Sequence, residues 1–96
     1  MRHRDIELDP SSRRVLRGGE PVELTGREFV ILEALLANLG KALSRERIEE
    51  MLYGWDGGVE SNALEVHIHH LRRKLGNDLI RTLRGVGYMI PEAARD

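Results

Sequence analysis

The chain has 96 residues, of which 41% are hydrophobic, 32% are charged and none is cysteine, and its formal net charge is −1. A chain this short buries one hydrophobic core, so we expect a single domain over residues 1–96; the lack of cysteine excludes disulfides and thiolate metal sites. No apolar run approaches the roughly 18 to 20 residues of a membrane span, and the first residues contain no apolar signal segment. The sequence therefore predicts a cytoplasmic protein with no membrane partner.

The charges are distributed unevenly along the chain. Residues 44–60 carry two cations and five anions, whereas residues 61–96 carry six cations, four anions and three histidines. The net charge by itself argues against a nucleic-acid partner, because non-specific affinity comes mainly from cations that neutralise phosphates. The mildly basic C-terminal end leaves such a partner open.

The first third of the chain is typical of short strands. The segments DIEL, RRVLR and PVEL are separated by DPSS and by Gly18-Gly19, a dipeptide suited to the positive φ angles of a tight hairpin. We therefore predict an antiparallel β-meander over residues 5–24. The ends of the chain, before Arg4 and after Pro91, are expected to fray.

Two helices are predicted next. The T-G-R-E stretch at residues 25–28 matches a capping box and starts the first helix. Its apolar residues recur at spacings of three and four up to Leu39, and Gly40 supplies the stop. Ser44 can cap a second, shorter helix that ends at about residue 52.

A third helix is predicted over residues 61–76, where a serine N-cap opens the apolar periodicity and a Gly-Asn pair ends it. After this helix, residues 79–90 have the pattern of two strands around a glycine-containing turn, which predicts a C-terminal hairpin. At about 100° per residue, the apolar side chains of the third helix form one narrow stripe that must face the core. The stripe consists of Leu64, Ile68, Leu71 and Leu75.

The opposite face of the third helix carries compact polar side chains, with cations at its C-terminal border. Recognition of DNA bases requires such a face on a helix whose other side is anchored in a core. Asparagine and histidine can donate or accept at base edges, valine can meet a thymine methyl group, and the cations can meet phosphates. The face consists of Asn62, Ala63, Val66, His69, His70 and Arg73, with Arg72 and Lys74 beside it.

Two other interpretations of the histidines remain open. The first is a zinc site, which needs three or four converging ligands. His67 and His70 diverge on the helix, and Glu65 and His69 lack a third ligand nearby, so we expect no metal and no cofactor. The second is a solvated polar face. His67 lies at the margin of the core and is expected to be structural, donating a hydrogen bond to the backbone.

The order of elements and three long segments resemble the OmpR/PhoB-type winged-helix effector domain of two-component response regulators. LTGREFVILEALLANLGKALSRERI resembles the first two helices of that family, EVHIHHLRRKLG its recognition helix, and IRTLRGVGYMI its wing, in which the R-G-x-G-Y pattern is the most specific. LYGWD and SNALEVHIHHLRRKLG further resemble the PmrA/QseB-like branch. The resemblance implies an α+β winged helix-turn-helix with an antiparallel four-stranded N-terminal sheet, a three-helix core and a C-terminal β-hairpin wing.

The resemblance also implies a function. The domain would bind double-stranded promoter DNA sequence-specifically and control transcription without catalytic activity, with helix 61–76 in the major groove and wing 79–90 at the minor groove. Carried over by position, the polar face lies where the family reads bases, and Arg84 at the wing tip corresponds to the minor-groove arginine. The phosphate contacts fall on Tyr53, Arg72, Thr82 and Tyr88, to which the residue pattern adds Lys74.

Three further partners are implied by the family. These are a second copy, bound as a tandem dimer on direct-repeat half-sites, RNA polymerase, and the receiver domain of the full-length regulator, which is absent from these 96 residues. The resemblance implies that the loop YGWDGGVE at residues 53–60 contacts polymerase. The local charge supports an exposed, negative loop, because Asp56 and Glu60 meet no cation within the segment. Trp55 either joins that contact or anchors the loop against the core.

Two departures limit the transfer from the family: the receiver domain, with its phosphorylated aspartate, is absent from these 96 residues, and two histidines stand on the base-reading face. His69 and His70 stand where many relatives carry arginines, so pairing of arginine with guanine is not implied here. Gly85 and Gly87 are expected to be turn residues of the wing.

The rival function is a winged helix that binds only protein through its histidine face. The salt dependence of binding distinguishes DNA binding from this protein-only function.

Overall fold

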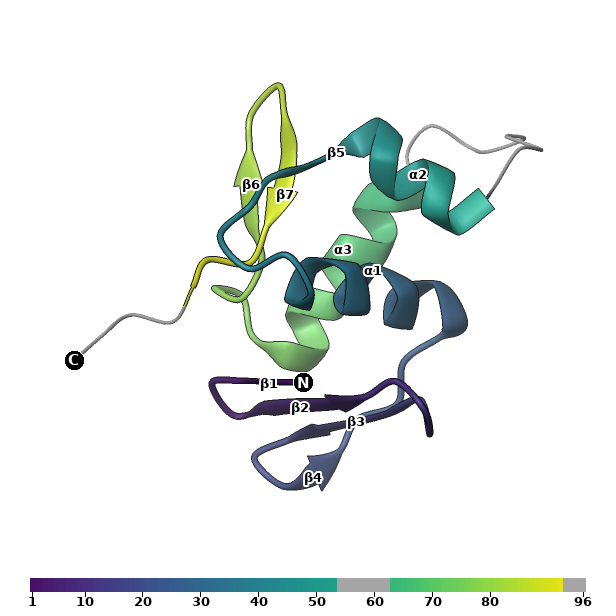
Figure 1. Ribbon diagram of the computed structural model, residues 1–96, viewed down its shortest axis with the longest axis vertical. Coiled ribbons are helices and arrows are strands. Elements are labelled where there is room, and N and C mark those ends of the chain that lie inside the picture. Colours follow the sequence, from purple (N-terminus) through teal and green to yellow (C-terminus); the bar gives the residue numbers. More distant parts are fainter. Residues whose placement is uncertain (54–62, 93–96) are drawn as a thin grey trace.

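The computed structural model describes residues 1–53 and 63–92. It begins with an antiparallel four-stranded sheet in which neighbours in sequence are neighbours in space (Figure 1). Gly18 and Gly19 adopt φ angles of 58° and 85° between the third and fourth strands, which confirms the predicted hairpin and meander. The strands are β1 (Arg2–His3), β2 (Ile6–Asp9), β3 (Arg14–Arg17) and β4 (Glu20–Pro21).

The prediction that the chain frays before Arg4 is wrong, because residues 2–3 form β1. His3 lies opposite Ile6 in the β1–β2 ladder and is only 4% exposed. A strand of two residues is too short to show the alternation by which strands are recognised in a sequence.

Three helices follow, and the predicted caps at Thr25 and Ser44 are confirmed, whereas the predicted cap at Ser61 lies outside the described residues. The Thr25 hydroxyl accepts from the amide of Glu28 at 3.1 Å, and the Glu28 carboxylate accepts from the amide of Thr25 at 3.1 Å. The hydroxyl of Ser44 accepts from the amide of Arg47 at 3.1 Å. The helices are α1 (Gly26–Leu36), α2 (Arg45–Tyr53) and α3 (Ala63–Leu75).

Helix α1 ends three residues earlier than its apolar pattern predicts. Asn38 turns its side-chain amide back to the carbonyl oxygen of Ala34 at 2.7 Å, which satisfies one of the carbonyls left open at the end of the helix. Leu39 still packs against the core, and this explains why the apolar periodicity extends beyond the helix. Gly40 then turns the chain with a φ of 77°.

The C-terminal hairpin of β6 (Arg81–Leu83) and β7 (Gly87–Met89) is confirmed, but it belongs to a three-stranded sheet. The third strand is β5 (Leu43–Ser44), which directly precedes α2 and pairs antiparallel with β7. Strand β5 was not predicted from the sequence, because it has two residues and no pattern of its own. Its pairing attaches the hairpin to the start of α2.

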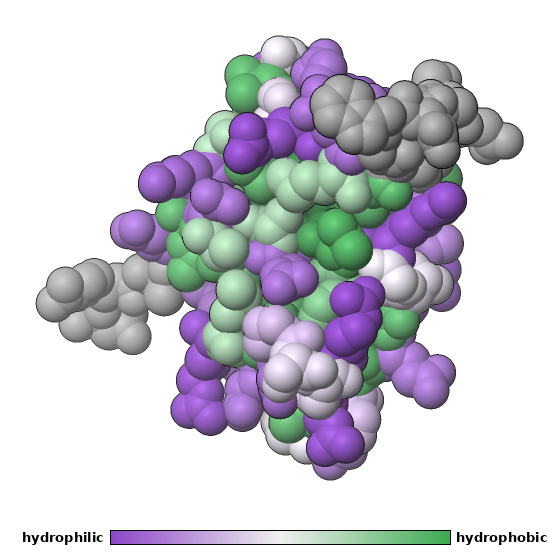
Figure 2. Space-filling model, turned by 45° about the vertical axis from the view of Figure 1, so that its right-hand side comes forward, coloured by the Kyte–Doolittle hydropathy of each residue, from purple (hydrophilic) through white to green (hydrophobic). Residues whose placement is uncertain are grey.

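One hydrophobic core joins the sheets and helices. The apolar stripe of α3 is at most 3% exposed and belongs to a cluster with residues of α1, β2, β3 and the C-terminal segment. In Figure 1 the N-terminal sheet lies below α1 and α3, and the hairpin and α2 lie above them. Figure 2 shows hydrophobic side chains gathered in the middle of one face, with hydrophilic ones around them. Within residues 1–53 and 63–92, no helix is both long and apolar enough to cross a membrane.

The two glycines of the hairpin have different roles. Gly85 is a turn residue, as expected, with a φ of 73°. The same expectation is wrong for Gly87, which lies in β7 and not in the turn. A Cβ at Gly87 would overlap the carbonyl oxygen of Leu43, so the close approach of β5 requires a residue without a side chain.

We predict that Gly87→Ala lowers the free energy of unfolding by about 1 to 3 kcal/mol, the usual cost of forcing extra volume into a packed site. Urea unfolding of the purified domain measures this change. Gly26→Ala is the matched control, because among the described residues a Cβ there meets nothing within 4 Å. Equal stability of the two variants would contradict the close approach of β5 to β7.

Candidate nucleic-acid interface

Helix α3 buries its apolar stripe and exposes much of the opposite face. Val66 is 45% exposed, although valine is usually buried. His70, which the sequence places on the same face, is half-buried. Among the side chains of the helix that the structure describes, the exposed ones are Glu65, Val66, His69 and Arg73.

The side chain that holds this face in position is Glu28 of α1, which is only 1% exposed. Its Oε1 accepts from the Lys74 ammonium at 2.7 Å in addition to the Thr25 amide, and its Oε2 lies 3.3 Å from Nδ1 of His70. A buried carboxylate persists only where charged partners and hydrogen bonds compensate for its lost hydration. One acid therefore caps α1 and fixes two residues in the C-terminal half of α3.

Opposing effects act on the pKa of Glu28. Burial by itself raises this pKa, but the hydrogen bond and charge of Lys74, together with the Thr25 amide and the His70 ring, lower it below the ordinary glutamate value. Glu28 is therefore ionised at neutral pH. An ionised carboxylate accepts hydrogen bonds and cannot donate them, which determines how its partners are protonated.

Arg72 links α3 to the hairpin. Its Nε and Nη2 donate to the carbonyl oxygen of Ile80 at 3.1 and 2.7 Å, and Nη2 also donates to the hydroxyl of Thr82 at 2.8 Å. Arg72 and Thr82 are both predicted phosphate contacts, and the structure brings them together at the base of the hairpin. These bonds fix the direction of the hairpin relative to α3.

The N-terminal sheet holds the C-terminal end of α3. Arg17 of β3 donates to the carbonyl oxygen of Lys74 in the last helical turn at 3.2 Å, and Arg4 pairs with Asp78 beyond the helix at 3.2 Å. A cation at the C-terminus of a helix is favourable because the carbonyl dipoles point towards it. Helix α3 is thus tied to α1, to the hairpin and to the N-terminal sheet.

The turn of the hairpin between β6 and β7 is exposed. Arg84 lies in this turn, and Val86 beside it is 53% exposed. Tyr88, by contrast, is 6% exposed and lies opposite Thr82 in the ladder. A hollow between the turn and the starts of α2 and α3 is lined by residues of the hairpin and by the ion pair of Arg45 with Glu65.

The three histidines of α3 have different surroundings. His69 is exposed, and its ring centroid lies 6.0 Å from that of His70. Nε2 of His67 is buried and has no hydrogen-bond partner among the described residues, so this nitrogen does not make the expected bond to the backbone. Burial lowers the pKa of His67, although the charge of Glu28 opposes this shift. In the part of the chain that the structure describes, no three His, Cys, Asp or Glu residues are grouped as metal ligands.

Several predicted site residues lie outside the described part of the chain. Trp55, Asp56, Glu60 and Asn62 belong to residues 54–62, and the side chains of Tyr53 and Ala63 are outside the description as well. Their roles stay predictions. Those that the structure does place on α3 and the hairpin are Val66, His69, His70, Arg72, Arg73, Lys74, Thr82, Arg84 and Tyr88.

From the sequence, Glu28 is recognisable only as part of a helix cap. Its contacts with His70 and Lys74 join residues 42 and 46 positions apart in the chain, and no local pattern indicates them. One signal was available, since Glu28 precedes Leu32 and Leu35 by four and seven residues and so lies on the buried face of α1. An acid on an apolar face requires a partner from another element.

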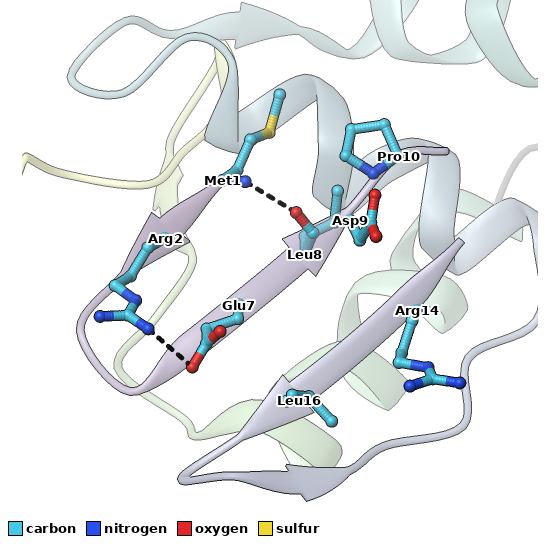
Figure 3. A pocket seen from close by; sticks show the side chains of 8 residues that line it. All are labelled: Met1, Arg2, Glu7, Leu8, Asp9, Pro10, Arg14 and Leu16. Carbon is cyan, nitrogen blue, oxygen red and sulfur yellow. Dashed lines mark hydrogen bonds and ion pairs between the residues drawn. The ribbon is translucent and has the colours of Figure 1, made fainter. Parts of the chain in front are cut away.

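A second hollow lies on the N-terminal sheet (Figure 3). Its lining comes from β1, β2, β3 and the residues beside them. Arg2 pairs with Glu7 at 3.0 Å, and the amino group of Met1 donates to the carbonyl oxygen of Leu8 at 2.7 Å. No residue of α3 or of the hairpin lines this hollow, and it is not part of the candidate interface.

We predict that Glu28→Gln lowers the free energy of unfolding by about 1 to 3 kcal/mol at pH 7, the range for hydrogen bonds to a charged group. Because the pKa of Glu28 is lower in the folded than in the unfolded state, its contribution is present above the unfolded-state pKa and is lost as the pH falls through the folded-state pKa. The stability difference between wild type and variant should therefore shrink on acidification.

Urea unfolding at a series of pH values measures this dependence. Glu33→Gln is the matched control on the same helix, because Glu33 makes no ion pair with any residue in the described ranges. A difference between wild type and Glu28→Gln that stays constant from neutral to acidic pH would show that the Glu28 carboxylate does not stabilise the fold through its charge.

Comparison with known proteins places these features in a family. Residues 19–90 match the family described as "Transcriptional regulatory protein, C terminal". The chain is 58% identical over 92 residues to the response regulator protein PmrA of Pseudomonas aeruginosa, an alignment that covers 96% of this chain and 42% of PmrA. The chain therefore spans less than half the length of this relative. The similarity to PmrA agrees with the branch that the sequence resembles.

Solved structures share the fold. The DNA-binding domain of CpxR from E. coli superposes with a TM-score of 0.87 at 34% identity, covering 98% of this chain and 97% of that one. The RstA DNA-binding domain of Klebsiella pneumoniae, in complex with the RstA box, has a TM-score of 0.82 at 30% identity and covers 95% of each chain. The winged-helix fold is thereby confirmed. By its match over residues 19–90 and by this shared fold, the chain belongs to the family of OmpR/PhoB-type C-terminal effector domains of transcriptional response regulators.

Proposed function

We propose that this domain binds double-stranded DNA sequence-specifically and controls transcription, with α3 in the major groove and the hairpin as a wing over the adjacent minor groove. The observation that carries the proposal is the rigid mounting of an exposed polar helix face. Helix α3 is fixed by Glu28, Arg72 and Arg17, while Val66 and His69 stay exposed. A side chain discriminates between bases only when its backbone is held in position.

The dimensions of the helix and the family support this proposal. With 13 residues, α3 is about 20 Å long at roughly 1.5 Å per residue, and the major groove, about 12 Å wide, accepts a helix. The related RstA domain is described in complex with its DNA box, and the related CpxR fragment is described as a DNA-binding domain. Because this family consists of transcriptional regulators, binding without catalysis is the proposed activity.

The proposed base-reading set is the polar face of the third helix. Exposure supports three of its members, Val66, His69 and Arg73. His70 is half-buried, so it would approach a base with one edge of its ring. Asn62 and Ala63 are included from the sequence. In the wing, Arg84 is proposed for the minor groove, because a guanidinium is attracted to the negative potential of a narrow A·T-rich groove.

The proposed phosphate contacts divide into two groups. Arg72 and Lys74 already make hydrogen bonds within the domain. A phosphate would therefore bind to the N–H groups of these side chains that the internal hydrogen bonds do not use. The Thr82 hydroxyl oxygen accepts a hydrogen bond from Arg72, so its hydroxyl hydrogen can be donated to a phosphate. Tyr88 is 6% exposed and would make contact through its hydroxyl group, while Tyr53 is included from the sequence.

Partners beyond DNA are proposed from the family. They are a receiver domain in the full-length regulator, a second copy on direct-repeat half-sites, and RNA polymerase, which the loop with Trp55, Asp56 and Glu60 would contact. Two exposed acids of α2, Glu46 and Glu50, extend the negative charge on the helix that leads into this loop. Measuring transcription and DNA affinity on the same loop variants separates a polymerase contact from an effect on the position of α3.

We predict that the logarithm of the DNA association constant falls linearly with the logarithm of the salt concentration, by about 0.9 for each phosphate neutralised. A duplex selected from a random pool with the purified domain should be used, and its affinity compared with that of unselected duplex. A module that binds only protein would show no affinity for any duplex. Failure to enrich any sequence at moderate salt would refute the proposed function.

We predict that Arg84→Ala weakens binding to the selected duplex by about 1 to 3 kcal/mol and relaxes preference for an A·T-rich step beside the major-groove site. The melting temperature should change little, because Arg84 is exposed in a turn. Arg14→Ala is the matched control, an exposed arginine on the N-terminal sheet. Equal losses for the two variants would show that Arg84 contributes only non-specific charge.

A further inference from the structure

We infer that Glu28 fixes the tautomer of His70, so that α3 presents Nε2 of His70 as a hydrogen-bond acceptor for the exocyclic amino group of adenine or cytosine. This inference rests on the proposed function, because it assigns a base preference to one residue of the DNA-reading face. It makes Glu28 a positioning residue that acts through His70 and does not itself contact DNA.

The geometry gives each oxygen of Glu28 its own partners. Oε1 is occupied by the Lys74 ammonium at 2.7 Å and by the Thr25 amide at 3.1 Å. Oε2 is left for Nδ1 of His70, at 3.3 Å. Because the carboxylate is 1% exposed, water does not compete for this bond, and the ring is held by a group that is itself fixed in the core.

The protonation of the ring follows from its partner. An ionised carboxylate can only accept, so Nδ1 of His70 must carry a hydrogen. In a neutral imidazole one nitrogen donates and the other accepts, so a hydrogen on Nδ1 leaves a lone pair on Nε2. The low pKa of Glu28 agrees with this assignment, because the carboxylate stays ionised wherever histidine is neutral.

Nε2 of His70 is on the accessible side of the ring. Within the described residues, the buried side-chain nitrogens without a partner belong to His3 and His67, and His70 is not among them. The side chain of His70 is 43% exposed. One edge of the ring therefore faces Glu28 and the other faces outward, on the helix face proposed to enter the major groove.

An acceptor at this place selects among bases. In the major groove adenine offers its N6 amino group and cytosine its N4 amino group, whereas guanine and thymine offer carbonyl oxygens. Neutral His70 would therefore favour an amino group. An arginine at the same place would do the opposite, because a guanidinium carries donors and no acceptor. Among described residues, His69 has no carboxylate partner of this kind and is free to use either tautomer.

Other charged and titratable groups surround the ring. Lys74 shares the Glu28 carboxylate from the same helix, and the His69 ring is 6.0 Å away. His67, whose pKa is affected by Glu28, Arg27 and His70, lies three residues before His70 on the helix. Of the groups just named and Glu28, the ionised carboxylate is the one that accepts hydrogen bonds and cannot donate one. The tautomer is therefore set by Glu28.

Nitrogen-15 NMR of the imidazole rings in the free domain tests the positioning step without DNA. At about pH 8, where histidine is neutral, His70 should show a protonated Nδ1 and an unprotonated Nε2. Glu28→Gln should shift His70 towards the other tautomer, because an amide can accept or donate. Thr25→Ala is the matched control: it removes the hydroxyl that caps α1 but leaves the carboxylate, so the tautomer should not change. A protonated Nε2 in the wild type would overturn the inference.

Base substitution in the selected duplex tests the reading step. His70→Ala should abolish the base preference at one base pair. At that base pair the wild type should favour an amino group over a carbonyl oxygen by about three- to tenfold, the ratio that one net hydrogen bond gives. Thr25→Ala should keep this ratio, and Glu28→Gln should bring it towards one. If His70→Ala leaves the preference at every position unchanged, His70 does not read a base.

These outcomes distinguish the inference from the function on which it rests. If no duplex is selected at all, the proposed function fails, while the NMR result still decides whether Glu28 sets the tautomer. If the domain binds a selected duplex but prefers a guanine or thymine carbonyl opposite His70, DNA binding stands and the inference is wrong.

Discussion

The buried carboxylate of Glu28 provides the interaction on which the arrangement of α3 depends. It closes the capping box of α1 and, with the same side chain, bonds Lys74 and His70 of α3. An ionised group that is 1% exposed would be strongly destabilising without these partners. Sliding or rotation of α3 along α1 would separate the buried carboxylate from Lys74 and His70, which compensate its charge. A strict geometric requirement thereby fixes the helix that is proposed to read DNA.

The cations at the C-terminal end of α3 show how binding and architecture share side chains. Arg72 holds the hairpin through the Ile80 carbonyl and Thr82, and Lys74 compensates Glu28, while Arg73 remains exposed. A basic border on a helix is therefore only partly available to phosphates. The net charge of −1 does not contradict the proposed DNA binding, because sequence specificity comes from base contacts at defined positions and not from total charge.

The wing depends on the two glycines of the hairpin. Gly87 permits β5 to approach β7, and Gly85 closes the turn that exposes Arg84. The R-G-x-G-Y pattern therefore combines two structural glycines with one arginine proposed to contact DNA. Histidines on α3 would offer bases a different chemistry from arginines, while the fold is shared with the CpxR and RstA domains.

The sequence by itself determined the features that depend on neighbouring residues: the capping box at Thr25 and Glu28, the apolar stripe of α3 and the glycine turns. These signals are local because helix caps, helical periodicity and tight turns are satisfied within a few residues. Only the tertiary structure decided the two-residue strands β1 and β5, the early end of α1, and the partners of Glu28 and Arg72. The contacts of β5 and Glu28 join segments far apart in the chain, where the close approach of backbones and the compensation of a buried charge leave no local pattern. Strand β1 and the Asn38 hydrogen bond at the end of α1 involve too few residues to show a pattern of their own.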